Sequence, residues 1–207
     1  MNKKIETAYA LYSSGQVFKA LDLLKTLVIE YPNEAILHNL SGACYSSLGN
    51  LNEAVDSYKE ALSIKQDYAE VHNSLGVALQ GLGQLNEAVK SYEDSLSISP
   101  NYAQAHNNLG NVFRELKKLG AAISCYEKSI AIKPNFAFPY YNLGVIFYEQ
   151  NELNKAVSFF EKAISINPKY HEAYNNLGGV LQMLGKINPA VESYKKAIII
   201  NLDFLDA

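Results

Sequence analysis

The sequence predicts an all-α solenoid, in which six copies of one antiparallel helix pair form a single domain over residues 1–207. The first observation behind this prediction is an internal period of 34 residues, which is typical of stacked supersecondary units rather than of a globular core. The second is that each copy holds two stretches in which apolar residues recur at spacings of three and four, as on an amphipathic helix. The period is carried by columns of alanine, glycine, aromatic residues and proline: Ala20, Ala54, Ala88, Ala122, Ala156 and Ala190; Gly42, Gly76, Gly110, Gly144 and Gly178; Tyr58, Tyr92, Tyr126, Phe160 and Tyr194; Pro32, Pro100, Pro134 and Pro168.

These columns divide the chain into repeats whose positions are numbered 1 to 34. Gln66 and Leu202 fill the gaps in the proline column, and a truncated seventh repeat is predicted to start at Leu205. The six repeats are 1–34, 35–68, 69–102, 103–136, 137–170 and 171–204.

The third repeat shows how each copy builds its two helices. Apolar residues from Val71 to Leu82 form the buried stripe of the first helix, which Gly83 ends because glycine accepts the left-handed conformation of a C-terminal cap. Asn86 is the predicted N-cap of the second helix, and Pro100 ends that helix. The equivalent cap residues are Asn52, Asn154 and Asn188, with Pro189 at the first helical position.

The small and aromatic columns predict how the two helices of a repeat pack. Gly76 lies in mid-helix, where glycine costs about 1 kcal/mol relative to alanine. Such a cost is tolerated where a side chain would block the close approach of a neighbouring helix. We therefore expect Ala88 to make the close contact and the Tyr92 ring to fill the space beside it.

Composition and charge exclude several function classes. The net charge of −3, with no basic run, argues against a nucleic-acid surface. No segment approaches the roughly 20 apolar residues of a membrane span, and the first residues lack the apolar core of a signal peptide. Cys44 and Cys125 stand in different columns, so neither a disulfide nor a metal site is predicted. We expect a cytoplasmic protein without a cofactor.

The columns resemble those of the tetratricopeptide repeat family along essentially the whole chain. The resemblance is carried by the Leu-Gly pair at 75–76, then Gly83, Ala88, Tyr92 and Pro100, with the same columns in the other copies. It implies a right-handed superhelix whose first helices line a concave groove that holds a peptide or a partner's helix. The departures are Ala8 and Leu24 in the first repeat, and Lys117 and Asn151 in place of the turn glycine.

The resemblance implies that positions 2, 5, 6, 9, 12 and 13 of each repeat line the groove. Asparagine recurs there, and a column of primary amides can pair with a peptide backbone of any sequence. The column is similar to the asparagine ladder in the tetratricopeptide domain of O-linked GlcNAc transferase. Compositional bias from an AT-rich genome is the alternative explanation, because asparagine also recurs at turns. The predicted binding residues are Asn39, Asn73, Asn107, Asn108, Asn111, Asn142, Asn175 and Asn176.

A second group of predicted binding residues lies between Arg114 and Tyr148. Arg114 is the only arginine and can offer a bidentate contact to an acidic group. Phe138, Tyr141 and Tyr148 add aromatic surface, which is enriched at binding hot spots. The lysines with which some family members grip a C-terminal carboxylate are absent from position 5.

No motif predicts catalysis or metal binding. The regular column of His38, His72 and His106 continues as Tyr140 and Tyr174 and fits packing between repeats better than metal ligation, because residues one repeat apart cannot converge on one ion. We therefore expect a non-enzymatic scaffold that binds a peptide or protein segment. Two alternatives stay open: a substrate-recruiting arm at the amino end of a transferase-type enzyme, and self-association through the last repeat, for which no capping helix is predicted.

Overall fold

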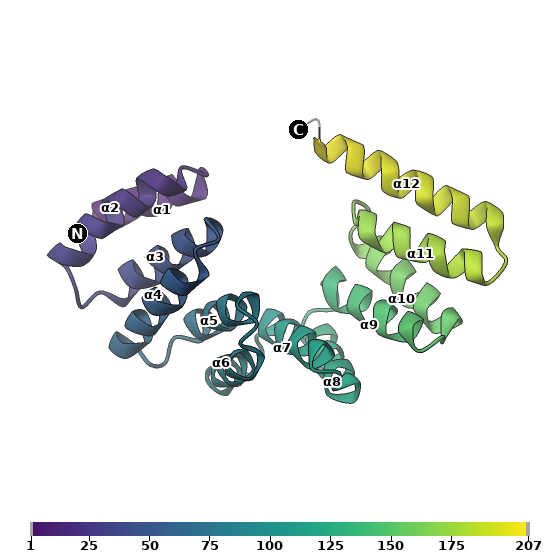
Figure 1. The fold of residues 1–207 in the computed structure, drawn as a ribbon, viewed down its shortest axis with the longest axis horizontal. Helices are drawn as coiled ribbons and strands as arrows, with labels where there is room; N and C mark the ends of the chain where they lie inside the picture. Colours follow the sequence, from purple (N-terminus) through teal and green to yellow (C-terminus); the bar gives the residue numbers. More distant parts are fainter. Residues whose placement is uncertain (1, 206–207) are drawn as a thin grey trace. The chain divides into compact units, whose positions relative to one another are not determined.

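A computed structural model describes residues 2–205, and the side chains of residues 3–201, as a series of α-helices joined by short turns (Figure 1). All twelve helices of the described residues fall at the two predicted places in each repeat, so the all-α repeat fold is confirmed. Their bounds are α1 Asn2–Ser13, α2 Val17–Glu30, α3 Ala35–Ser47, α4 Leu51–Ile64, α5 Ala69–Gly81, α6 Leu85–Ile98, α7 Ala103–Glu115, α8 Leu119–Ile132, α9 Ala137–Glu149, α10 Leu153–Ile166, α11 His171–Met183 and α12 Ile187–Leu205.

The helices group into two compact units, residues 1–112 (unit 1) and residues 113–207 (unit 2). Within unit 1, α1 packs on α2, α3 on α4 and α5 on α6, and the successive pairs meet through α2 with α3 and α4 with α5. Within unit 2, α9 packs on α10 and α11 on α12, and these two pairs meet through α10 with α11. A single domain over residues 1–207 stays a prediction.

The turn between the two helices of a repeat determines where the second helix starts. In the third repeat Gly83 has φ +74°, and the backbone N–H of Gln84 donates to the carbonyl oxygen of Leu79 over 2.9 Å. This is the hydrogen bond of a Schellman motif, so Gln84 both closes α5 and precedes α6. The predicted N-cap was therefore wrong: α6 starts at Leu85, and Asn86 lies inside its first turn.

The same correction applies to the other predicted caps. Asn52, Asn154 and Asn188 lie inside α4, α10 and α12, and Pro189 follows the first helical residue by two positions. The residues that do precede α4 and α10 are Asn50 and Glu152, and neither side chain bonds to the helix end. In these turns the preceding helix, rather than a capping side chain, sets the start of the next one.

The two residues that replace the turn glycine adopt its conformation. Lys117 has φ 60° and Asn151 has φ 59°. The Schellman bond persists at both turns. The backbone N–H of Lys118 donates to the carbonyl oxygen of Phe113, and that of Glu152 donates to the carbonyl oxygen of Phe147, each over 2.8 Å. Lysine pays about 1–2 kcal/mol for a left-handed backbone, so the packing of the flanking helices outweighs that cost.

The core repeats one contact between a glycine and an aromatic ring. A Cβ built on Gly76 would lie 2.7 Å from Cε1 of Tyr92, and one built on Gly144 would lie 2.7 Å from Cδ1 of Phe160. Both rings are fully buried. The expected close approach is thus made by the aromatic ring of the second helix against the bare backbone of the first.

The histidine column ties each repeat to the loop before it. Nε2 of His72 lies 3.0 Å from the carbonyl oxygen of Gln66, and His38 and His106 make the same bond to Pro32 and Pro100 over 2.8 and 2.9 Å. Because a carbonyl oxygen only accepts, Nε2 carries the proton in each ring. Tyr140 continues the pattern by donating to Pro134 over 3.2 Å.

Buried tyrosines predict a loss of stability in alkali. Burial raises the pKa of Tyr58 to about 12, and it also raises the pKa of Tyr126 and Tyr170. An unfolded tyrosine ionises near pH 10, so between pH 10 and the folded pKa the unfolded chain holds fewer protons than the native chain. Stability is then fully present below about pH 10 and falls above it, by about 1.4 kcal/mol per pH unit for each such tyrosine.

Urea unfolding across this pH range, followed by circular dichroism, checks the expectation. Tyrosinate absorbance should rise together with unfolding rather than before it. A free energy of unfolding that stays level from about pH 9 to pH 11 would contradict the assignment.

Candidate interaction surface

Unit 1 contains a largely apolar hollow on its first helices. Its volume is about 390 Å³, near the lower end of small-ligand pockets. Its lining residues hold positions 2, 5, 6 and 9 of the first two repeats, and the ring of Tyr68, just before α5, completes the lining. The lining residues are Ile5, Glu6, Tyr9, Ile36, Asn39, Leu40 and Tyr68.

Unit 2 contains a more polar hollow of about 320 Å³. Positions 5 and 6 again contribute, through Tyr141, Asn175 and Asn176, while the C-terminal half of α12 supplies one wall. Glu172 adds a carboxylate, with His171 Nε2 3.5 Å from its Oε2. The remaining lining residues are Ala197, Ile198 and Asn201.

The predicted asparagines differ widely in how much of each side chain solvent reaches. Asn73, Asn107 and Asn142 are buried, with 5%, 5% and 8% of their surface exposed. Asn175 is exposed, and the other four, Asn39, Asn108, Asn111 and Asn176, are half-buried.

Some of these amides bond to each other across neighbouring repeats. Nδ2 of Asn108 donates to Oδ1 of Asn73 over 3.1 Å, joining position 6 of one repeat to position 5 of the repeat before. The same step in unit 2 joins Asn176 Nδ2 to the hydroxyl oxygen of Tyr141 over 3.1 Å. Each bond uses part of an amide's capacity and holds the side chain in place. An amide group can make up to four such bonds, so capacity remains for a partner at the exposed positions.

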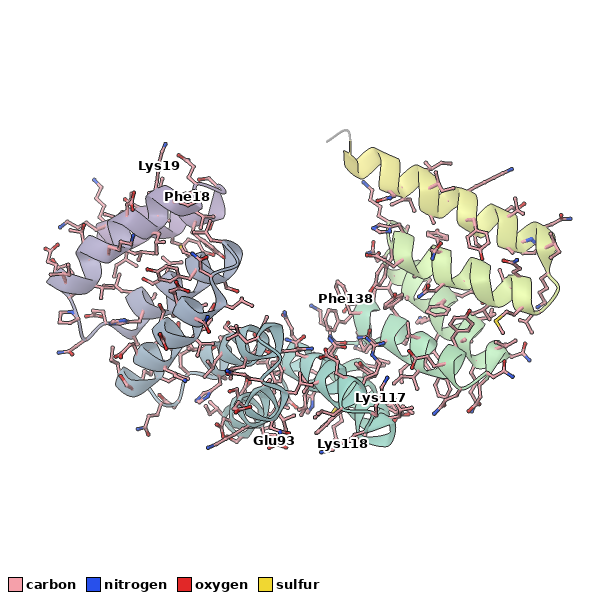
Figure 2. The ribbon with its side chains drawn as sticks, viewed as in Figure 1. Phe18, Lys19, Glu93, Lys117, Lys118 and Phe138 are labelled. Carbon is pink, nitrogen blue, oxygen red and sulfur yellow. The ribbon has the colours of Figure 1, made fainter. Side chains whose placement is uncertain are left out.

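Aromatic side chains of the fifth repeat form a connected cluster. The ring centroid of Tyr170 lies 5.5 Å from that of Phe138 and 4.9 Å from that of Tyr141. Phe138, at the start of α9, keeps half of its surface exposed (Figure 2). Burial raises the pKa of Tyr141, and the hydrogen bond from Asn176 opposes that rise. Tyr148 is half-buried on α9.

Arg114 lies beside Glu149, one repeat apart. Nη1 of Arg114 is 3.9 Å from Oε1 of Glu149, a long ion pair, and both side chains keep contact with solvent. Nε of Arg114 is buried without a hydrogen-bond partner. Because Nε is buried, an acceptor from a partner can reach the guanidinium through its Nη groups, on a side chain that is 34% exposed.

Sequence reasoning missed most residues that line the unit 1 hollow. Only Asn39 was among the predicted binding residues, whereas Tyr9 and Ile36 are 62% and 44% exposed. A usable signal existed, because both are large apolar residues at positions assigned to the groove. In unit 2, α12 is the second helix of its repeat. Its contribution to the hollow could not be predicted, because the predicted binding positions all lie on first helices.

The described residues meet neither the requirement of a metal site nor that of a membrane-spanning helix. Among residues 3–201, no three side chains of the metal-binding kinds come together. Within the described part of the chain, every helix is too short or too polar to cross a membrane.

Models of known families match most of the chain. A model described as TPR repeat matches residues 42–83, 81–116 and 110–150. Two models described as tetratricopeptide repeat match residues 137–170 and 159–191. No curated protein matches the chain by sequence.

Solved structures share the fold. MamA is 27% identical, with a TM-score of 0.68 over 80% of this chain and 97% of its own. PilF of Pseudomonas aeruginosa is 18% identical, with a TM-score of 0.83 over 93% of this chain and 87% of its own. YrrB, titled a TPR protein with an unusual peptide-binding site, is 21% identical, with a TM-score of 0.63 over 88% of this chain and 94% of its own.

Proposed function

The chain belongs to the tetratricopeptide repeat family, and we propose that it is a non-catalytic scaffold that binds a peptide or partner segment on its first helices. The observation that carries this proposal is that each unit has a hollow on its first helices. It lies where positions 5 and 6 of these helices meet solvent. Binding clefts are usually concave, with a few polar groups that orient the ligand.

The amide ladder supports a ligand with an extended backbone. The pairs Asn73–Asn108 and Tyr141–Asn176 hold their side chains in one orientation before any ligand arrives. A pre-ordered surface loses less conformational entropy on binding. In this proposal the exposed amide of Asn175 bonds to the backbone of the ligand, as in the asparagine ladder of O-linked GlcNAc transferase, and Arg114 binds an acidic group.

The test is a selection of random displayed peptides against the whole chain, followed by fluorescence anisotropy on the enriched peptides. Replacing exposed hollow residues, with Tyr9→Ser and Ile36→Ser in unit 1 or Glu172→Ser and Asn175→Ser in unit 2, should weaken binding about tenfold or more. The control is Ile29→Ser with Ile199→Ser, two exposed residues on second helices. Equal losses in the control, or no enriched peptide at all, would contradict the proposal.

A second candidate function is self-association through α12. In the fifth repeat, Leu153, Val157 and Ile164 are half-buried against the cluster that includes Leu177 and Val180 of α11. Their equivalents on α12, Ile187, Val191 and Ile198, are 57%, 43% and 59% exposed. One face of α12 is therefore apolar without a neighbouring helix among the described residues.

The first helix does not offer a matching face to this surface. At positions 3, 7 and 10, α11 buries Ala173, Leu177 and Val180, whereas α1 exposes Lys3, Thr7 and Ala10. Stacking α12 of one copy on α1 of another would bury an ammonium group and a hydroxyl group against isoleucine. An isologous contact between two α12 helices avoids that cost.

The predicted seventh repeat concerns the same end of the chain. α12 continues to Leu205, through the position at which earlier repeats have proline. Residues 206 and 207, which would continue a seventh repeat, lie outside the described residues.

A further inference from the structure

We propose that the hollow of unit 1 receives an aromatic side chain of the partner segment, next to which the partner carries a lysine or arginine. The inference rests on the proposed function and names the chemistry of the ligand at one of its two hollows. It follows from a comparison of two repeats and from the charges around the hollow.

The fifth repeat shows which side chains can pack against the aromatic ring at position 34, which is Tyr170 in that repeat. There the rings of Phe138, at position 2, and Tyr141, at position 5, lie against the Tyr170 ring at centroid distances of 5.5 and 4.9 Å. In the second repeat Ile36 and Asn39 hold positions 2 and 5, and Tyr68 holds position 34. These smaller side chains leave the hollow beside Tyr68. An aromatic side chain from a partner would supply the ring contacts that the fifth repeat makes internally.

The fold does not require an apolar residue at position 2, where Ile36 lines this hollow. Position 2 is occupied by Glu70, Gln104 and Glu172 in other repeats, all of them exposed. Ile36 is exposed as well, at 44%. Tyr9, which lines the same hollow, is 62% exposed, and exposed apolar side chains gathered in this way often mark interaction sites.

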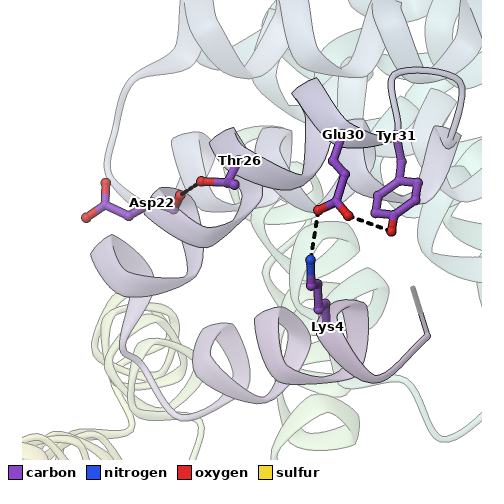
Figure 3. Close-up of polar contacts among 5 residues, drawn as sticks. All are labelled: Lys4, Asp22, Thr26, Glu30 and Tyr31. Carbon is purple, nitrogen blue, oxygen red and sulfur yellow. Dashed lines mark hydrogen bonds and ion pairs between the residues drawn. The ribbon is translucent and has the colours of Figure 1, made fainter.

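The charge at the rim favours a basic neighbour for that aromatic residue. Among the residues that line the hollow, Glu6 is the one with a carboxylate. Lys4, two residues away, is engaged elsewhere: its Nζ donates to Glu30 over 2.8 Å, and Glu30 also accepts from Tyr31 (Figure 3).

Lys65 contacts the Tyr68 ring, one of the side chains that line the hollow, but does not itself line it. Its ammonium lies 4.7 Å from the centroid of the Tyr68 ring, over one face of that ring. At positions 2, 5, 6, 9, 12 and 13 of the described part of unit 1, the charged residues are Glu6 and Glu70, and neither lysine nor arginine occurs. The partner's basic residue is therefore expected next to Glu6.

The test begins with a random displayed peptide library selected on the whole wild-type chain. The enriched peptides should carry phenylalanine, tyrosine or tryptophan next to lysine or arginine. The first variant, Ile36→Phe with Asn39→Tyr, gives the second repeat the two rings that the fifth repeat accommodates. This variant should fold, and its affinity for the enriched peptides should fall about 10- to 100-fold, since its own rings fill the hollow. The control, Ile29→Phe on an 83% exposed side chain of α2, should bind as wild type.

The second variant, Glu6→Lys, tests the charge. This variant should bind the basic peptides up to about fivefold more weakly at low salt. A new library selection on the variant should favour peptides with an acidic residue next to the aromatic one. Glu60→Lys on α4, also exposed, should change neither result.

The outcomes separate the inference from the proposed function. Peptides that bind without an aromatic residue, or that bind the filled variant as tightly as wild type, would overturn the inference while leaving the scaffold function intact. A library that yields no binding peptide at either hollow would overturn both. Circular dichroism and thermal unfolding of the filled variant establish that any loss of binding comes from a folded chain.

Discussion

Gly144→Ala is expected to destabilise unit 2 by about 1–3 kcal/mol, although alanine is the better helix former. The new Cβ would lie 2.7 Å from both Cδ1 and Cε1 of Phe160, whose ring is fully buried. The ring cannot turn into solvent, so the helices must separate or the ring must leave its rotamer. The measurement is the free energy of unfolding in urea, compared with wild type.

Gly120→Ala is the matched control in the same unit. Gly120 lies in α8, its backbone is not left-handed, and a Cβ there would meet no atom within 4 Å. The same chemical change should therefore stabilise the chain by up to about 1 kcal/mol. Adding Phe160→Leu to Gly144→Ala should recover part of the loss, because the smaller side chain leaves room for the methyl group. Equal effects of the two glycine changes would show that backbone freedom, rather than the ring contact, explains the glycine column.

Ile198→Lys is expected to abolish self-association if α12 mediates it, whereas Ile199→Lys should leave it unchanged. Both side chains are 59% exposed, so the two changes remove the same exposed apolar surface. They differ in the face that they occupy. Ile164, the equivalent of Ile198, is half-buried against the next repeat, but Ser165, the equivalent of Ile199, is exposed. A lysine at position 198 would place a charge in the contact, at a cost that an apolar interface cannot offset.

Light scattering after size-exclusion chromatography, over a range of concentrations, measures this effect. The wild-type chain and Ile199→Lys should show a mass that rises with concentration, and Ile198→Lys should remain a monomer. If wild type is monomeric throughout, or if both lysine variants dissociate alike, self-association through this face of α12 is rejected.

The sequence predicted the fold well because the period repeats one structural solution. Each column reports the same contact several times, so close helix packing at Gly76 could be predicted from the pattern alone. The prediction gave that contact to Ala88, whereas the Tyr92 ring makes it. The start of the second helix was predicted two residues late. Asparagine is a common N-cap, but here the Schellman turn after Gly83 places Gln84 in that role, and a side-chain preference could not reveal a backbone bond.

The candidate surface was predicted less completely, because columns describe what repeats share. The unit 1 hollow arises where the second repeat differs from the fifth, at Ile36 and Asn39 against Phe138 and Tyr141. Likewise, the burial of Asn73 depends on its bond to Asn108 and its neighbours in space. Binding by the predicted asparagines, by Arg114 and by the aromatic residues stays a prediction.

The proposed position of the partner segment is on the first helices of the repeats. It is tested most directly by amide chemical-shift mapping of the isotope-labelled chain with a peptide enriched in the selection. We expect the largest shifts at positions 2, 5, 6 and 9 of the first helices, around Ile36 and Asn39 in unit 1 or Glu172 and Asn175 in unit 2. Shifts concentrated on the exposed faces of the second helices, such as those around Ile29 and Lys59, would contradict it.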